Sequence, residues 1–157
     1  MAAVSLAFAF VSVLVTVTVT DLERRVIPNV ILAAGAAIGL TIIVAADPGS
    51  LSGRLVAAAA AGGFLLLGRV ARRDGMGMGD VKLAALMGLY LGRAVVPALL
   101  IAFAAGALAG MWLMVRHGTA ARRWALPFAP FLAVGGIAGL LVGDEAVEWY
   151  LDELLRD

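Results

Sequence analysis

Long apolar stretches alternate with short polar ones along this chain. The apolar stretches predict six helices, at about 2–20, 30–46, 52–68, 81–93, 95–115 and 126–143. A helix that crosses the hydrocarbon core of a bilayer needs roughly 20 apolar residues, so most of these segments are long enough to span a membrane. The third and fourth are shorter, and we expect them either to begin inside the neighbouring polar segments or to stop short of one surface.

Composition favours a membrane protein over a soluble one. The chain is 63% hydrophobic, whereas ordinary soluble domains contain roughly 45–50% apolar residues. It has no cysteine, which excludes disulfides and thiolate metal sites, and its single histidine, His117, argues against a histidine-based zinc site. We therefore expect an all-α integral membrane protein with about six transmembrane helices and with neither metal nor cofactor.

Basic residues gather in alternate polar segments. Residues 21–29, 69–82 and 115–125 hold most of the lysines and arginines of the chain, namely Arg24, Arg25, Arg69, Arg72, Arg73, Lys82, Arg116, Arg122 and Arg123. The positive-inside rule places these three segments in the cytoplasm and both termini outside. No lysine or arginine precedes Arg24, so the positive start of a secretory signal is missing and the first helix is predicted to be retained.

Residues 144–157 follow a different pattern from the rest of the chain. Apolar residues recur there at helical spacing, with acidic residues between them. This pattern predicts a short amphipathic helix resting on the outer surface of the membrane. The expected organisation is therefore one transmembrane domain over residues 1–143, followed by an acidic amphipathic helix over residues 144–157.

Two aspartates lie at the ends of apolar segments on the same predicted side of the membrane. Asp21 ends the first segment, and Asp80 begins the fourth, directly after a glycine-rich turn. A carboxylate at the membrane border is costly and commonly functional. Two carboxylates that share a site hold one proton between them, which is the basis of aspartic proteolysis. If their helices are adjacent, we expect Asp21 and Asp80 to form a catalytic pair.

Simpler interpretations and other functions stay open at this point. Aspartate is a good helix N-cap, so Asp80 is also explained as the start of a helix, and Asp21 as interfacial charge. Lys82 is explained either as a side chain that snorkels to the surface or as a group that tunes the charge of Asp80. Intramembrane acids also serve proton-coupled transporters or channels, although neither aspartate motif has the second copy that a repeat would give. A structural scaffold of a pilus or secretion assembly is a third class.

Three motifs, in family order, resemble those of the type IV prepilin peptidases. Asp21 to Asn29 resembles the first motif, in which six residues separate an aspartate from a proline that is followed by Asn or Asp. Gly77 to Leu83 resembles the second motif, Gly-x-Gly-Asp-x-Lys-Leu. Residues 126–132 resemble the third, Pro-Phe-Gly-Pro-Phe-Leu, with Ala129 in place of the usual glycine. The resemblance spans roughly residues 5–142.

The resemblance implies an intramembrane aspartic endopeptidase whose catalytic residues correspond to Asp21 and Asp80. The motif positions that would support the site are Pro28, Asn29, Gly77, Gly79, Lys82, Pro127 and Pro130. The implied substrate is a prepilin-like or preflagellin-like precursor with a short basic leader ahead of an apolar helix, cut at the cytoplasmic border. The expected partners are this substrate and the lipid bilayer, and not nucleic acid.

The family's long members carry a further cytoplasmic region with paired cysteines, which is linked to N-methylation of the trimmed product. This chain has no cysteine. It is therefore similar to the short members, and we expect it only to cleave.

Overall fold

The computed structural model describes residues 1–71, 77–118 and 127–154 of the chain. Predictions that concern Arg72, Arg73, Arg122, Arg123 or residues 155–157 fall outside these ranges. The described residues form helices and no strands: α1 (Ala2–Arg24), α2 (Asn29–Ala46), the 3-10 turn η1 (Pro48–Ser50), α3 (Leu51–Ala71), α4 (Met78–Leu91), the 3-10 turn η2 (Gly92–Ala94), α5 (Val95–His117) and α6 (Ala129–Leu154). The all-α prediction is confirmed.

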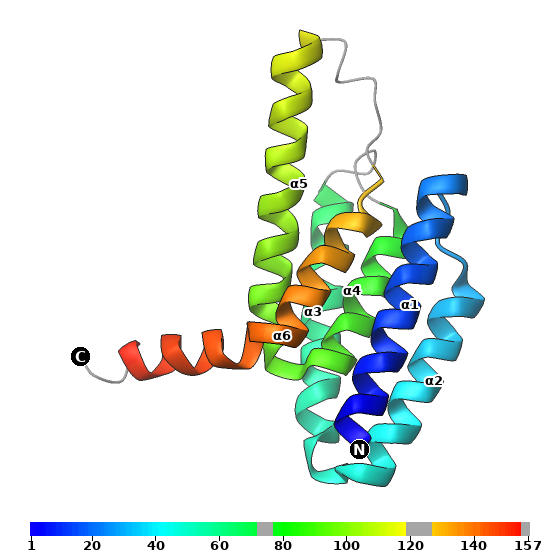
Figure 1. The fold of residues 1–157 in the computed structure, drawn as a ribbon, viewed down its shortest axis with the longest axis vertical. Helices are drawn as coiled ribbons and strands as arrows, with labels where there is room; N and C mark the ends of the chain where they lie inside the picture. The colour runs from blue at the N-terminus through cyan, green and yellow to red at the C-terminus, as the bar shows by residue number, and fades with distance from the viewer. Residues whose placement is uncertain (72–76, 119–126, 155–157) are drawn as a thin grey trace.

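Five helical segments are long and apolar enough to cross a membrane: Ala2–Arg24, Asn29–Ala46, Pro48–Ala71, Met78–His117 and Ala129–Glu153. The chain is thus a multi-pass membrane protein. The third predicted segment proves to be a helix of 21 residues, because it begins at Leu51 and continues past residue 68 to Ala71. The fourth of the five segments holds two antiparallel helices, α4 and α5 (Figure 1). With 14 residues, α4 is about 21 Å long, which is shorter than a hydrocarbon core of roughly 30 Å.

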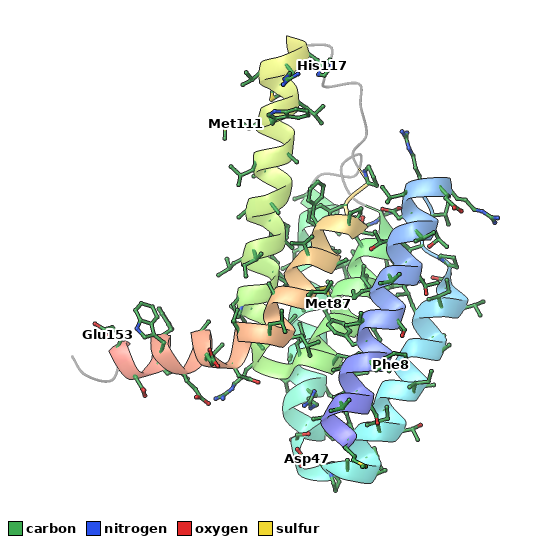
Figure 2. The ribbon with its side chains drawn as sticks, in the orientation of Figure 1. Phe8, Asp47, Met87, Met111, His117 and Glu153 are labelled. Carbon is green, nitrogen blue, oxygen red and sulfur yellow. The ribbon has the colours of Figure 1, made fainter. Side chains whose placement is uncertain are left out.

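The helices alternate in direction along the bundle (Figure 1). The ends of α1, α3 and α5 therefore point to the same end of the bundle as the starts of α2, α4 and α6. We call this the connection end. Met1, η1 and η2 lie at the opposite end, and Figure 2 shows Asp47 there, far from His117. The three polar segments that carry most of the basic residues thus begin and end on one side.

The short helix α4 forms the centre of the bundle. It contacts each of the other five α-helices, and ten of its 14 residues are buried. Leu83 and Met87 are completely enclosed, and Met87 lies in the interior in Figure 2. A helix that is apolar on all sides is expected to be surrounded in this way. The one hydroxyl on α4 is paired, since Tyr90 Oη donates to the carbonyl of Gly35 at 2.6 Å.

Close contact between α3 and α4 depends on a glycine. A Cβ atom on Gly88 would lie 2.5 Å from the carbonyl oxygen of Ala57 and 2.6 Å from Cα of Ala58. These neighbours are backbone atoms, so they cannot move aside as the tip of a flexible side chain would. Small residues allow such close approach between helices in a membrane, where packing is a main source of association.

Replacing Gly88 with alanine should therefore separate α3 from α4. We expect Gly88→Ala to lower the free energy of unfolding by about 1–3 kcal/mol, the usual cost of overpacking. Gly63→Ala is the matched control, because a Cβ on Gly63 of α3 would meet nothing within 4 Å. Thermal unfolding in detergent micelles compares the two. Equal midpoints for both variants would contradict the close packing described here.

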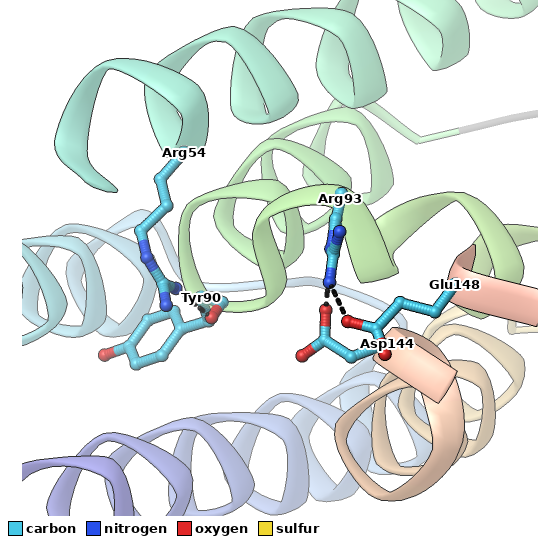
Figure 3. A network of polar contacts seen from close by, with 5 residues as sticks. All are labelled: Arg54, Tyr90, Arg93, Asp144 and Glu148. Atoms are coloured by element: carbon cyan, nitrogen blue, oxygen red, sulfur yellow. Dashed lines mark hydrogen bonds and ion pairs between the residues drawn. The ribbon is translucent and has the colours of Figure 1, made fainter. Parts of the chain in front are cut away.

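Two arginines organise the end opposite the connection end (Figure 3). Arg54 of α3 donates to the carbonyls of Leu89 and Tyr90, in the last turn of α4, and so supplies partners for acceptors that a helix leaves unpaired. Arg93 of η2 forms ion pairs with Asp144 at 3.2 Å and Glu148 at 2.6 Å, both on α6. These contacts join the C-terminal end of α4 and the adjoining η2 to neighbouring helices.

The acidic C-terminal segment is not a separate helix. α6 continues without interruption from Ala129 to Leu154 and so includes both the apolar and the acidic part. No proline lies between them to end the helix. Figure 1 shows that the last part of α6 runs across the direction of the bundle and away from it. The ion pairs of Arg93 attach the start of this part to η2.

Candidate active site

Asp21 and Asp80 lie together at the connection end of the bundle. Each is only 7% exposed, and they are the two charged residues that the described part of the chain buries. α1 supplies Asp21 from its last turn, and α4 supplies Asp80 from its first turn. These two helices are in contact. The structure therefore places the two predicted acids on contacting helices at one end of the bundle.

Asp80 is held by its own helix. Its Oδ2 accepts a hydrogen bond from the backbone N–H of Gly77 at 3.1 Å. Gly77 is the N-cap, so Asp80 caps α4 from the third helical position and is not itself the N-cap residue. α4 consequently begins at Met78, earlier than the segment expected from residue 81. A carboxylate in the first turn also interacts favourably with the helix dipole.

Asp21 is held by a different helix. Its Oδ2 accepts a hydrogen bond from the backbone N–H of Ala129, the first residue of α6, at 3.3 Å. Asp21 lies near the C-terminal end of α1, where the helix dipole disfavours a negative charge. The N-terminal end of α6 offsets this effect, because its dipole and its free N–H both favour an anion. The side chain of Asp21 therefore acts as a cap for α6.

The sequence around Ala129 leaves its N–H available to Asp21. Pro130 has no N–H, and the N–H groups of Phe131 and Leu132 bond to the carbonyl of Phe128. Among the donors of the first turn, the Ala129 N–H is thus the one directed at a side chain. Pro127 and Pro130 flank this donor, and proline is tolerated in a first helical turn. The third motif therefore has a structural role at the site, as the start of α6.

The first and second motifs also contact each other. Nζ of Lys82 donates to Oδ1 of Asn29 at 2.7 Å, so Lys82 joins the starts of α4 and α2. A Cβ on Gly79 would lie 2.7 Å from Cβ of Ile27, so glycine is needed for the α1–α2 connection to pack on α4. Pro28 has an extended backbone and is the N-cap of α2.

Sequence reasoning missed two features near the aspartates. The first is the Ala129 N–H, which has no signature in residue type because every residue except proline carries such a donor. The second is Thr18, one turn before Asp21, whose buried hydroxyl has no hydrogen-bond partner among the described residues. Within the described ranges, no group of three or more His, Asp or Glu side chains is arranged to hold a metal ion.

The matches with known proteins all indicate the same family. The chain matches the type IV leader peptidase family over residues 8–115, a segment that includes both aspartates and the first two motifs. It is 36% identical over 148 residues to a prepilin leader peptidase/N-methyltransferase of Bacillus subtilis (strain 168), covering 92% of this chain and 58% of the relative. Relatives with the same name from Pseudomonas putida and Aeromonas salmonicida (strain A449) are 33% identical over 138 residues and 36% identical over 108 residues.

These two alignments cover 80% and 68% of this chain, but only 45% and 36% of the relatives. The chain therefore spans roughly a third to three fifths of the length of the curated relatives compared. No solved structure matches it.

Proposed function

The chain belongs to the type IV leader peptidase family, and from this premise we propose that it is an intramembrane aspartic endopeptidase. Its substrates would be prepilin-like or preflagellin-like precursors, from which it removes the short basic leader. The observation that carries the proposal is the burial of Asp21 and Asp80 together at one end of the bundle, inside the segment that matches the family.

The proposed reaction uses the two carboxyl groups as a proton-sharing pair. The ionised member takes a proton from a water molecule, and the oxygen of that water attacks the carbonyl carbon of the scissile peptide bond. The protonated member donates a hydrogen bond to the carbonyl oxygen, and a proton then passes to the departing nitrogen as the C–N bond breaks. Oδ2 of each aspartate accepts a backbone N–H. We assign Oδ1 of each to the water and the substrate.

We propose that the connection end faces the cytoplasm and that both termini lie outside. Arg24, Arg25, Arg69 and Arg116 all belong to helix ends on this side, and positive charge favours the inner face. In this arrangement α4 is a sixth, short crossing that is shielded from lipid by the other helices. Residues 1–143 would form the peptidase domain, and the acidic end of α6 would rest on the outer surface.

This orientation suits the proposed substrate. A leader that stays in the cytoplasm and an apolar helix that enters the bilayer would place the peptide bond between them at the inner border. In the proposed orientation Asp21 and Asp80 would lie at that depth, because both belong to helix turns at the connection end. Water can reach such a border far more readily than the bilayer centre, so a hydrolytic reaction is feasible there.

Cleavage of a purified precursor tests the proposal. The chain, reconstituted in lipid nanodiscs, is mixed with a prepilin-like protein, and the products are identified by mass spectrometry. We expect one cut between the leader and the apolar helix. An intact precursor after prolonged incubation would contradict the peptidase assignment, and proton-coupled ion flux in liposomes without any cleavage would favour the transporter class.

A further inference from the structure

All but one of the hydroxyl side chains on α1 form a hydrogen bond with the backbone of the same helix. Four of them donate to the backbone carbonyl one turn earlier, and these are Ser5, Ser12, Thr16 and Thr20. The exception is Thr18, whose Oγ1 is buried and has no partner among the described residues. Its hydroxyl therefore does not use the carbonyl of Leu14, which stands one turn earlier and is the local acceptor that the other four residues use.

This orientation of Thr18 is costly for the folded protein. A hydroxyl that is buried without a hydrogen bond has lost its bonds to water and gained none in exchange. Threonine in a helix has two accessible rotamers, one of which lets Oγ1 bond to a carbonyl of the preceding turn. A low-cost alternative is thus available within the same helix. Buried polar groups without partners are rare, and a catalytic role is one of the recognised reasons for them.

Thr18 lies next to Asp21 on α1. The two residues are three apart, so they are neighbours on one face of α1 with Cβ atoms about 5–6 Å apart. This separation is suited to one water molecule that bonds to both side chains. Oδ2 of Asp21 is already engaged by the Ala129 N–H, and Oδ1 is assigned to the water. A buried water needs two to four polar partners, and the two aspartates alone supply the minimum.

We propose that Oγ1 of Thr18 is a further hydrogen-bond partner of the water that attacks the scissile peptide bond. This inference rests on the proposed peptidase function. The hydroxyl accepts a hydrogen bond from one O–H of the water, while Asp21 accepts the other and removes that proton. The water oxygen is thereby held with a lone pair free to form its bond to the carbonyl carbon. Thr18 itself gains and loses no proton.

Thr18→Val tests the proposal, because valine keeps the shape of threonine and removes only the hydroxyl. We expect kcat to fall about 5–10-fold, as for the loss of one hydrogen bond in the transition state, with KM unchanged. The unfolding temperature should stay the same or rise, because a costly buried hydroxyl is gone. Thr18→Ser keeps the hydroxyl and should retain kcat within about twofold. Rates are normalised to the folded fraction.

Thr16→Val is the matched control on the same helix, since Thr16 is exposed and bonds to the carbonyl of Ser12. Its kcat should equal that of the parent. A parental kcat for Thr18→Val would overturn the role of Thr18 while leaving the peptidase function intact, and so would an equal loss in Thr18→Val and Thr18→Ser. If valine prevents folding, Thr18→Ala and Thr18→Ser give the same comparison. A parent that fails to cleave would overturn the peptidase function instead.

Discussion

Asp21→Asn and Asp80→Asn should each abolish peptide cleavage while leaving the helical bundle folded. Asparagine has nearly the same shape as aspartate, and its carbonyl oxygen can still accept the hydrogen bond from Ala129 or from Gly77. It cannot take a proton from water or give one to the leaving nitrogen. Because general acid–base catalysis contributes about 10²–10⁴-fold, we expect each variant to lose at least that much in initial rate, measured on the purified precursor.

Two further variants make this prediction specific. Asp47→Asn removes a carboxylate that is exposed at the end of the bundle opposite the connection end (Figure 2), and it should cleave at the parental rate. The double variant Asp21→Asn/Asp80→Asn should be no slower than either single variant, because residues that act as one unit are not additive. Parental cleavage by either single variant would show that the pair is not catalytic.

Ala129→Pro should impair cleavage strongly, although Ala129 carries no reactive group. Proline lacks the N–H that bonds to Asp21, and it is well tolerated at the first position of a helix such as α6. A hydrogen bond to a charged group contributes about 1.5–3 kcal/mol, so the rate should fall about 10–100-fold. Cleavage of the purified precursor measures this loss, and thermal unfolding checks that the bundle is intact.

Ala129→Gly provides the control, because glycine keeps the N–H and is the residue usual at this position of the third motif. It should cleave at close to the parental rate. Equal rates for the proline and glycine variants would mean that the backbone donor of α6 has no influence on Asp21. The start of α6 would then be only a helix end next to the site.

The hydropathy pattern was sufficient to predict the helices but not their arrangement. In a membrane, residues that face lipid and residues that face other helices are both apolar. The pattern therefore could not reveal that the other helices surround α4, which is the shortest of the α-helices. It also could not reveal that α6 continues past Gly143 into the acidic segment, because glycine weakens a helix without ending it.

The candidate site was only partly predictable for a similar reason. Asp21 and Asp80 could be selected because carboxylates at the borders of apolar segments are costly. The basic residues then placed both on one side of the membrane. Their partners were not predictable, because Gly77 and Ala129 contribute backbone N–H groups that most residues could supply. The orientation of the Thr18 hydroxyl likewise depends on a rotamer that residue type does not determine.

Cross-linking in native membranes tests most directly whether the two aspartates form one site. The chain has no cysteine, so Asp21→Cys/Asp80→Cys carries only the two introduced thiols. A short reagent that bridges two thiols should join residues 21 and 80 within one chain, and mass spectrometry should recover the linked peptides. Asp47→Cys/Asp80→Cys, with thiols at opposite ends of the bundle, should remain unlinked. Failure to link residues 21 and 80, or equal linking of both pairs, would contradict a shared site.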